Sequence, residues 1–177
     1  MAGPPYTASP GAKRGDVELY GLKQFPMKKK TGSGSQYEIE IGLILVQDTS
    51  LTPYAVKVAG AGAVGPHYMS RGMRFKPDVE TDYNMNDRGT WLAALDTDPV
   101  VSAVQYGSMC LLENIGDLEP GDRVMCAANG KITLYDGSGL DKVVGTYFHK
   151  PGEGDGKSLA THATTGDLVW VMLGAGR

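Results

Sequence analysis

The chain has little of what a catalytic or metal centre needs. Its 177 residues include only two cysteines, Cys110 and Cys126, and three histidines, His67, His149 and His162. Two cysteines with scattered histidines make a poor set of zinc ligands, and no histidine has a spacing that indicates a nucleophile with its base. No serine lies in a Gly-x-Ser-x-Gly motif. We therefore expect a protein that is not an enzyme and that holds no cofactor and no metal.

The sequence also lacks a long apolar run and an excess of positive charge. No run approaches the roughly 20 apolar residues that cross a bilayer, and residues 1–6 contain no apolar signal core. The formal net charge is −3, whereas binding to nucleic acid needs a dense positive face. We expect neither a membrane nor a nucleic acid as a partner, and a protein that is made and kept in a cytoplasm.

The two cysteines lie on stretches that are predicted to be strands. In a reducing compartment such thiols stay free, so two buried thiols are the expectation for Cys110 and Cys126. A disulfide between them is the alternative.

Glycine and proline, by contrast, are abundant. The 25 glycines and 10 prolines make up about 20% of the chain, against a usual share of roughly 12%. This composition favours many turns and short strands over a helix bundle, and only residues 86–95 read as a helix, of one or two turns. Strands are predicted at 37–46, 54–58, 100–112, 123–127, 131–135, 142–149 and 167–173. The predicted fold is mainly β, an antiparallel β-barrel or sandwich with at most one short helix.

Two of these segments make sharper predictions. Apolar residues alternate from residue 37, and the second face becomes apolar at Ile44 and Val46. That end of the strand should be buried on both sides, by another sheet or another subunit. Asn129-Gly130 stands between two alternating stretches and predicts a tight hairpin, because both positions tolerate positive φ. Val124, Cys126, Ile132 and Leu134 should then point into one core.

Several glycine-containing fragments look like ligand-binding motifs without completing them. Gly60–Gly65 is a literal G-x-G-x-x-G after a strand, but Pro66 follows where a dinucleotide site needs a helix. We expect a glycine turn that binds no nucleotide. Residues 156–158 resemble the end of a phosphate loop, whose first glycine would fall at Pro151. Residues 82–87 resemble the opening of a calcium loop but are better explained as a capped turn.

The two ends of the predicted domain suggest contact surfaces. Residues 1–16 are rich in proline, glycine and alanine, and a segment with so little apolar content does not order itself. We expect an extended N-terminal arm that a neighbouring subunit orders, followed by one β-rich domain at 17–177. Residues 25–35 are predicted to form a basic loop, which is either solvated or in contact with an acidic protein surface.

The order of turns in residues 101–173 resembles a known family. The stretch begins Val-Ser-Ala-Val-Gln-Tyr-Gly at 101–107 and continues Gly-Asp-Leu-Glu-Pro-Gly-Asp-Arg-Val at 116–124. Ala-Asn-Gly-Lys-Ile-Thr-Leu-Tyr follows at 128–135, then Val-Val-Gly-Thr-Tyr-Phe at 143–148 and Gly-Asp-Leu-Val-Trp-Val-Met-Leu at 166–173. This order resembles the C-terminal β-domain of the capsid cement (decoration) proteins of tailed bacteriophages.

The resemblance implies a virion structural protein that binds the outside of a phage capsid and stabilises the shell by bridging major capsid protein subunits. Such a protein would be a homo-oligomer, located in the host cytoplasm during assembly and then on the capsid surface. The arm and the basic loop supply the candidate capsid contacts, which are Pro4, Pro5, Tyr6, Lys13, Arg14, Lys28, Lys29 and Lys30.

Two other functions remain open at this point. A carbohydrate- or receptor-binding β-module of a phage particle would use exposed aromatic side chains, for which Tyr83, Trp91, Tyr135, Tyr147 and Trp170 are available. An all-β enzyme with a site shared between subunits would be the third possibility, with a role for the loop at 60–65.

Overall fold

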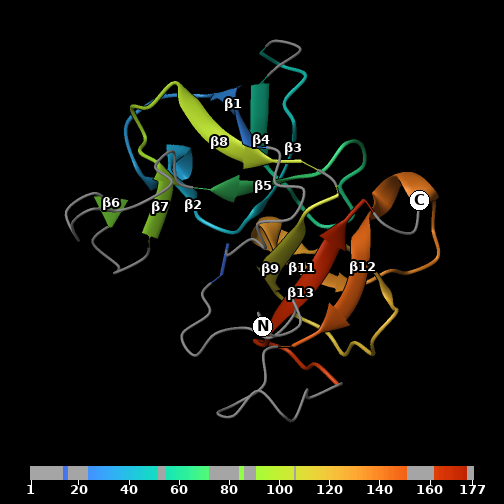
Figure 1. Cartoon of the computed structure of the whole chain (residues 1–177). Coiled ribbons are helices and arrows are strands. Elements are labelled where there is room, and N and C mark those ends of the chain that lie inside the picture. The colour runs from blue at the N-terminus through green and yellow to red at the C-terminus, as the bar shows by residue number, and fades with distance from the viewer. Residues whose placement is uncertain are drawn as a thin grey trace.

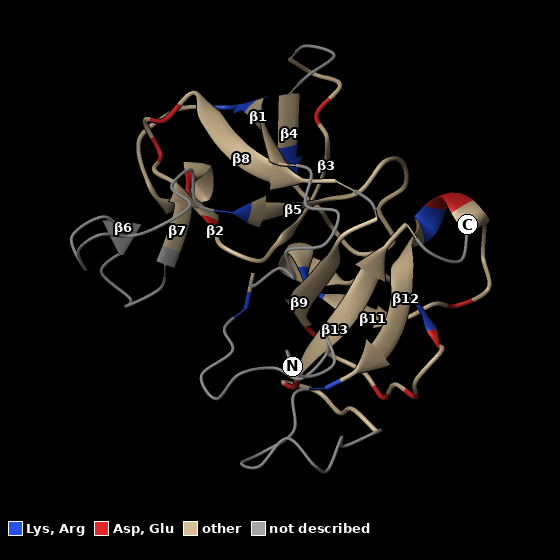
Figure 2. Cartoon of the chain, in the orientation of Figure 1, with Lys and Arg blue, Asp and Glu red and all other residues tan. Residues whose placement is uncertain are grey.

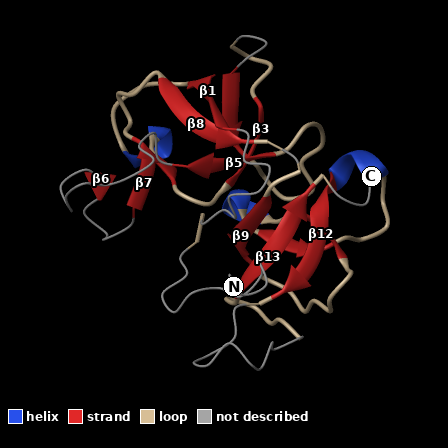
Figure 3. Cartoon of the chain, in the orientation of Figure 1, coloured by secondary structure: helices blue, strands red, loops and turns tan. Residues whose placement is uncertain are grey.

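A computed structural model describes residues 14–15, 24–51, 55–71, 84–85, 91–105, 107–150 and 162–174. Strands dominate these residues, which confirms the prediction of a mainly β fold (Figure 3). They form two main groups, one around β1, β3, β4, β5 and β8 and the other around β9 to β13, with β2, β6 and β7 beside the first group (Figure 1).

The first group is a five-stranded sheet that closes on itself as a small barrel, and we refer to it as the closed sheet. Its strands, in order of pairing, are β1 (Gln24–Lys29), β4 (Ala55–Val58), β3 (Ile44–Gln47), β5 (Tyr68–Arg71) and β8 (Val100–Val104). All neighbours are antiparallel except β1 and β4, which run parallel. Closure leaves no free edge strand, so this sheet offers its outer surface rather than an edge to a partner.

The second group is a five-stranded antiparallel sheet, which we refer to as the second sheet. It runs in the order β11 (Ile132–Leu134), β10 (Arg123–Cys126), β12 (Val143–His149), β13 (Leu168–Leu173) and β9 (Met109–Glu113). After β9, Asn114 forms a parallel bridge to Ile132, and the amide of Ile115 donates to the Ile132 carbonyl at 2.9 Å. The second sheet therefore curls into a ring-like shape without closing fully.

A third, small sheet consists of β2 (Ile39–Glu40), β7 (Trp91–Ala94) and β6 (Asn84–Met85). The prediction of a helix at 86–95 is wrong for residues 91–94, because β7 pairs with β2 and buries Leu92, Ala93 and Ala94. The helical residues of the described part are three short 3-10 turns, η1 (Ser35–Tyr37), η3 (Ala128–Gly130) and η4 (Leu140–Lys142). Pairing and burial have overridden the local helix preference.

The strand predicted at 37–46 is interrupted. The chain leaves η1, forms β2, turns at Gly42 with φ +78°, and only then enters β3. A side chain at Gly42 would lie 2.6 Å from the amide nitrogen of Gly15, so the close approach of another segment requires glycine at this turn.

The two-sided burial predicted for the end of this segment is confirmed, and another sheet provides it. Leu45 points into the core of the closed sheet, where it packs with Met27, Val56 and Val101. Ile44 points the other way, into a larger core that it shares with many residues of the second sheet. That core contains Ile44, Val46, Ala59, Met69, Val104, Cys110, Leu112, Leu118, Val124, Cys126, Ile132, Val144, Tyr147, Ala163, Val169, Val171 and Leu173.

The hairpin predicted at Asn129-Gly130 is present. Val124 pairs with Leu134 and Cys126 pairs with Ile132, while Asn129 and Gly130 have φ values of 57° and 70°. The side chains of Val124, Cys126 and Ile132 are fully buried, as predicted. Leu134 is 46% exposed, which corrects its assignment to the core.

The tip of this hairpin packs against the closed sheet. The amide of Gly130 donates to the carbonyl of Ala59 at 2.9 Å. A side chain at Gly130 would meet the Leu43 Cβ at 2.9 Å, the Ile44 carbonyl oxygen at 3.0 Å and the Val58 Cγ1 at 3.0 Å. Gly130 is therefore needed both for its positive φ and for the contact between the two sheets.

We predict that Gly130→Val destabilises the protein more than Gly137→Val does. Gly137 has a similar φ of +84° but has open space where its side chain would be. Strain from positive φ should cost about 1–2 kcal/mol in both variants, and overpacking should add about 1–3 kcal/mol at Gly130 alone. Urea unfolding measures both losses; equal losses would show that the tip contact does not contribute to stability.

Candidate docking surface

The predicted basic loop is a strand, and this decides which of its lysines can meet a partner. Residues 24–29 form β1, which pairs with both β8 and β4, so the prediction of a loop at 25–35 is wrong over this part. Lys28 and Lys30 are exposed, whereas Lys29 is only 6% exposed. Alternation along the strand places Phe25, Met27 and Lys29 on the inner side and Lys28 on the outer side.

Lys29 is part of the interior rather than of a contact surface. Its Nζ donates to the carbonyls of Tyr37 at 2.9 Å, Lys30 at 3.2 Å and Asp96 at 3.4 Å. Burial lowers the pKa of the Lys29 ammonium, while the nearby charges of Asp98 and Asp96 act in the opposite direction. The Lys29 ammonium is therefore not available to a partner, because its donors are used within the chain.

A third exposed lysine, Lys57, lies on the same face as Lys28. In the parallel pair of β1 and β4, Lys28 lies opposite Ala55, so Lys57, two residues on, has its side chain on the same outer surface. Asp48 lies near this surface. Its pKa is lowered first by the side-chain hydrogen bond from Ser50 and, to a smaller extent, by the charges of Lys57 and Lys30.

We refer to Lys28, Lys30 and Lys57 as the basic face. Figure 2 shows the lysine colour on β1 and β4 at one end of the molecule. Lys57 was not among the residues chosen from the sequence, although its alternation with Val56 and Val58 already indicated an outward side chain. What the sequence could not show is the parallel pairing that brings β4 beside β1.

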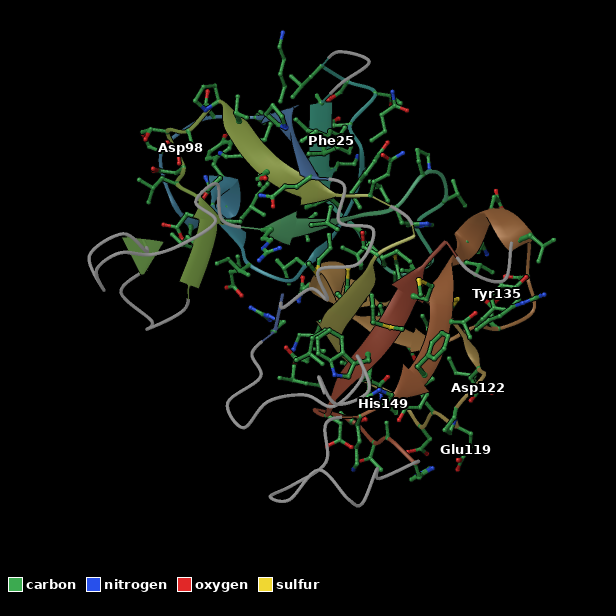
Figure 4. The ribbon with its side chains drawn as sticks, in the orientation of Figure 1. Phe25, Asp98, Glu119, Asp122, Tyr135 and His149 are labelled. Atoms are coloured by element: carbon green, nitrogen blue, oxygen red, sulfur yellow. The ribbon has the colours of Figure 1, made fainter. Side chains whose placement is uncertain are left out.

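The opposite end of the molecule carries exposed acids. Asp117 and Glu119 have side chains that are 79% and 62% exposed, and both lie near the imidazole of His162. The His162 Nδ1 lies 2.7 Å from the Glu119 Oε1. Figure 4 shows Glu119 and Asp122 beside the second sheet, away from Phe25 on the closed sheet. Both ends nevertheless carry charges of both signs, since Asp96 and Asp98 lie near Lys29 at the closed sheet and Arg123 and Lys142 belong to the other end.

Of the predicted arm contacts, Pro4, Pro5, Tyr6 and Lys13 lie outside the described residues. Arg14 is described, and its guanidinium is used within the chain. It donates to the Ile41 carbonyl at 2.9 Å, to the Glu40 carboxylate at 2.8 Å and to the Glu113 carboxylate at 3.0 Å.

The contacts of Arg14 join the small third sheet to the second sheet. Glu40 belongs to β2, which lies beside the closed sheet, while Glu113 ends β9 of the second sheet and also pairs with Lys131. We refer to Arg14, Glu40, Glu113 and Lys131 as the Arg14 network. Its contacts correct the assignment of Arg14 as a residue available to a partner.

The glycine motif is a turn, as predicted. Gly62 and Gly65 have positive φ, and the chain continues directly into β5 instead of a helix. The amide of Gly62 donates to the Cys126 carbonyl at 2.8 Å, and that of Gly65 donates to the Asp141 carbonyl at 3.1 Å. These amides hold the turn against the second sheet, so they are not directed at a phosphate.

The two cysteines are buried free thiols, as expected. Burial raises the pKa of the Cys126 thiol to about 12, and it raises the pKa of Cys110 further still. Both thiols lie in the core shared by the two sheets. They fill space there and are not activated nucleophiles.

Within the described ranges, His, Cys, Asp and Glu form no group of three or more that is arranged to hold a metal ion. Helices long and apolar enough to cross a membrane are not found in that part of the chain either. Of the aromatic residues proposed for a carbohydrate site, Tyr147 and Trp170 are buried and Tyr135 is half-buried. The side chains of Tyr83 and Trp91 lie outside the described set.

Comparisons with known proteins give a distant likeness among solved structures. No protein-family model and no curated protein matches the chain. Among solved structures, the chain is similar to the N base of the head fiber gp8.5 of bacteriophage phi29, with 13% sequence identity and a TM-score of 0.45. The match covers 86% of this chain and 93% of the other. This similarity is too low to assign a function.

The Arg14 network leads to a stability prediction. Arg14→Gln should lower the free energy of unfolding by about 1–3 kcal/mol, because hydrogen bonds to two partly buried carboxylates are lost. Arg123→Gln is the matched control, since Arg123 is exposed and should change stability by no more than about 0.5 kcal/mol. Chemical denaturation measures the free energy of unfolding of both variants. An Arg14 variant as stable as the control would contradict a stabilising role for the Arg14 network.

Proposed function

We propose that this chain is a virion structural protein that binds the outside of a phage capsid and bridges major capsid protein subunits. The observation that carries the proposal is the basic face, three exposed lysines on the outer surface of a closed sheet. The resemblance of residues 101–173 to the cement proteins supports the class of partner. The protein would act on the capsid surface after a period in the host cytoplasm, and as a homo-oligomer.

The construction of the closed sheet suits docking. Each strand has a hydrogen-bonded neighbour on both sides, so Lys28 and Lys57 stand on a surface that does not have to be ordered when a partner binds. Less ordering means that less conformational entropy is lost on association. An acidic patch on the major capsid protein is the partner chemistry that fits these ammonium groups.

Binding of this kind depends on repetition rather than on one strong site. A capsid offers the same surface many times, and several weak contacts to one lattice give high avidity. We include Pro4, Pro5, Tyr6 and Lys13 of the arm among the proposed contacts. The lysine contribution should weaken with salt, whereas the apolar contacts of Pro4, Pro5 and Tyr6 should be less sensitive.

Charge reversal on the basic face tests the proposal. Lys28→Glu with Lys57→Glu should weaken co-sedimentation with heads of the phage that encodes the chain by about tenfold or more. Arg123→Glu with Lys142→Glu is the control, because the exposed Arg123 and the half-buried Lys142 lie outside the basic face and the net charge changes equally. The difference between the two variants should shrink between about 50 mM and about 300 mM salt. Equal binding by both double variants would contradict docking through the basic face.

The effect on the shell gives a second test. A ligand that binds only the assembled lattice stabilises it by mass action. Heads that lack this protein should therefore assemble but rupture at lower temperature than heads that carry it, and adding the purified protein should restore the difference. Nuclease access to the packaged DNA during a heat ramp reports rupture; identical curves would contradict a shell-stabilising role.

A further inference from the structure

Asn129-Gly130, at the tip of the hairpin, is also the place where the chain is chemically most open to self-modification. Asparagine is a thermolabile residue, and Asn129 is the only asparagine in the chain that glycine follows. Because glycine has no side chain, its backbone nitrogen can be approached closely. That nitrogen can attack the side-chain amide of the asparagine before it, so Asn129 is a candidate site of spontaneous deamidation.

The reaction consumes water and releases ammonia. The Gly130 amide nitrogen loses its proton to hydroxide and attacks the Asn129 Cγ, and the bond from Cγ to the side-chain nitrogen breaks as ammonia leaves. The resulting succinimide ring then adds water at either of its two carbonyl carbons. One opening leaves an aspartate in the normal main chain. The other leaves isoaspartate, in which the main chain runs through the former side chain.

The structure exposes one reacting group and shields the other. Asn129 is exposed at the tip, whereas Gly130 is buried against the closed sheet. The amide of Gly130 donates to the carbonyl of Ala59 at 2.9 Å. A buried amide that is held in a hydrogen bond loses its proton mainly when the contact opens. The nitrogen is therefore protected while the tip stays in place.

The backbone of Asn129 also keeps the reacting atoms apart. With φ 57° and ψ 37°, the Gly130 nitrogen lies nearly anti to the Asn129 Cβ across the Cα–C bond. Ring closure needs both atoms on the same side of that bond, so ψ must rotate and carry the Gly130 N–H away from Ala59. This rotation breaks the contact of the tip but leaves the pairing of β10 with β11 in place.

We propose that Asn129 is a site of spontaneous deamidation that is closed while the hairpin tip contacts the closed sheet and open when the tip leaves it. Local opening of this kind costs less free energy than unfolding of the whole protein. The site does not depend on the proposed binding to a capsid.

The isoaspartate product prevents the tip from returning. It lengthens the main chain before Gly130 by an additional carbon atom, so Gly130 has to move. The packing leaves no room for this, because a Cβ at Gly130 would already lie 2.9 Å from the Leu43 Cβ and 3.0 Å from the Val58 Cγ1. Chemical modification of an opened state makes the opening irreversible.

Mass spectrometry of the full-length protein tests the protection of the site. Trypsin cuts after Arg123 and Lys131, so residues 124–131 form one peptide whose only asparagine is Asn129. At mildly alkaline pH, deamidation of this peptide should be at least about tenfold slower in the folded protein than in the same protein unfolded in urea. Equal rates, or an unfolded chain that does not deamidate at Asn129, would overturn the proposal.

Two variants in β4 separate opening of the tip from unfolding of the whole protein. Val58→Ala removes the methyl group next to Gly130 and should speed deamidation of the folded protein several-fold. Val56→Ala is the matched control, because it makes the same change inside the core of the closed sheet. Urea unfolding measures the stability of both variants. Deamidation rates that follow only the losses of stability would show that global unfolding opens the site, and the proposed role of the tip would be wrong.

The modified protein gives a test of the consequence. Protein that is deamidated in urea, refolded and separated by chromatography yields the isoaspartyl form. Asn129→Asp is its control, because this variant has the same charge and a normal main chain. The isoaspartyl form should unfold at a lower urea concentration than Asn129→Asp, or fail to refold where Asn129→Asp refolds. Equal urea midpoints would contradict the loss of the tip contact.

Discussion

Strand β3 packs against two cores at once, and the arrangement of the rest of the molecule depends on it. Leu45 closes the interior of the closed sheet, while Ile44 and Val46 belong to the core of the second sheet. Each side removes large apolar side chains from water, and burial of one such side chain contributes about 1.5–3 kcal/mol. The core of the second sheet therefore includes residues of the closed sheet, whereas the core of the closed sheet consists of residues from that sheet and from the small third sheet.

Three backbone hydrogen bonds lie near the packing of β3 against the second sheet. The hairpin tip at Gly130 reaches Ala59, and the amides of Gly62 and Gly65 reach the second sheet from the turn after β4. The Arg14 network adds a charged contact on another side. The glycines of the 60–65 segment, which look like a nucleotide motif in the sequence, are thus explained by the approach of two backbones. Together these contacts hold the closed sheet, the third sheet and the second sheet against one another.

The sequence predicted the features that depend on local pattern. The mainly β fold, the Asn129-Gly130 hairpin, the buried thiols and the two-sided burial around Ile44 all follow from alternation and turn residues. The sequence did not predict the features that depend on contacts between distant parts of the chain. Residues 91–94 form a strand because β2 lies beside them, and Leu134 is exposed because β11 is short and ends the pairing order. Arg14 was predicted to lie in an extended arm, because its partners Glu40 and Glu113 are distant in the sequence and gave no local signal.

The lysines also show which features the local sequence predicts and which features depend on pairing between distant strands. A run of three lysines indicates a basic surface, but only strand geometry separates the outward Lys28 from the inward Lys29. Lys57 joins the surface through a parallel pairing that has no local signature. Trp170 was proposed as part of a sugar site, whereas its side chain is 3% exposed and therefore belongs to the interior.

We propose that one body, made of two sheets around a common strand, docks on a capsid through the closed sheet. A cryo-electron microscopy reconstruction of phage heads mixed with the purified protein tests it most directly. We expect ordered density for both sheets, with Lys28, Lys30 and Lys57 facing the shell and Asp117 and Glu119 facing outward. Density with Asp117 and Glu119 against the shell, or heads without added density at saturating protein, would contradict docking through the closed sheet.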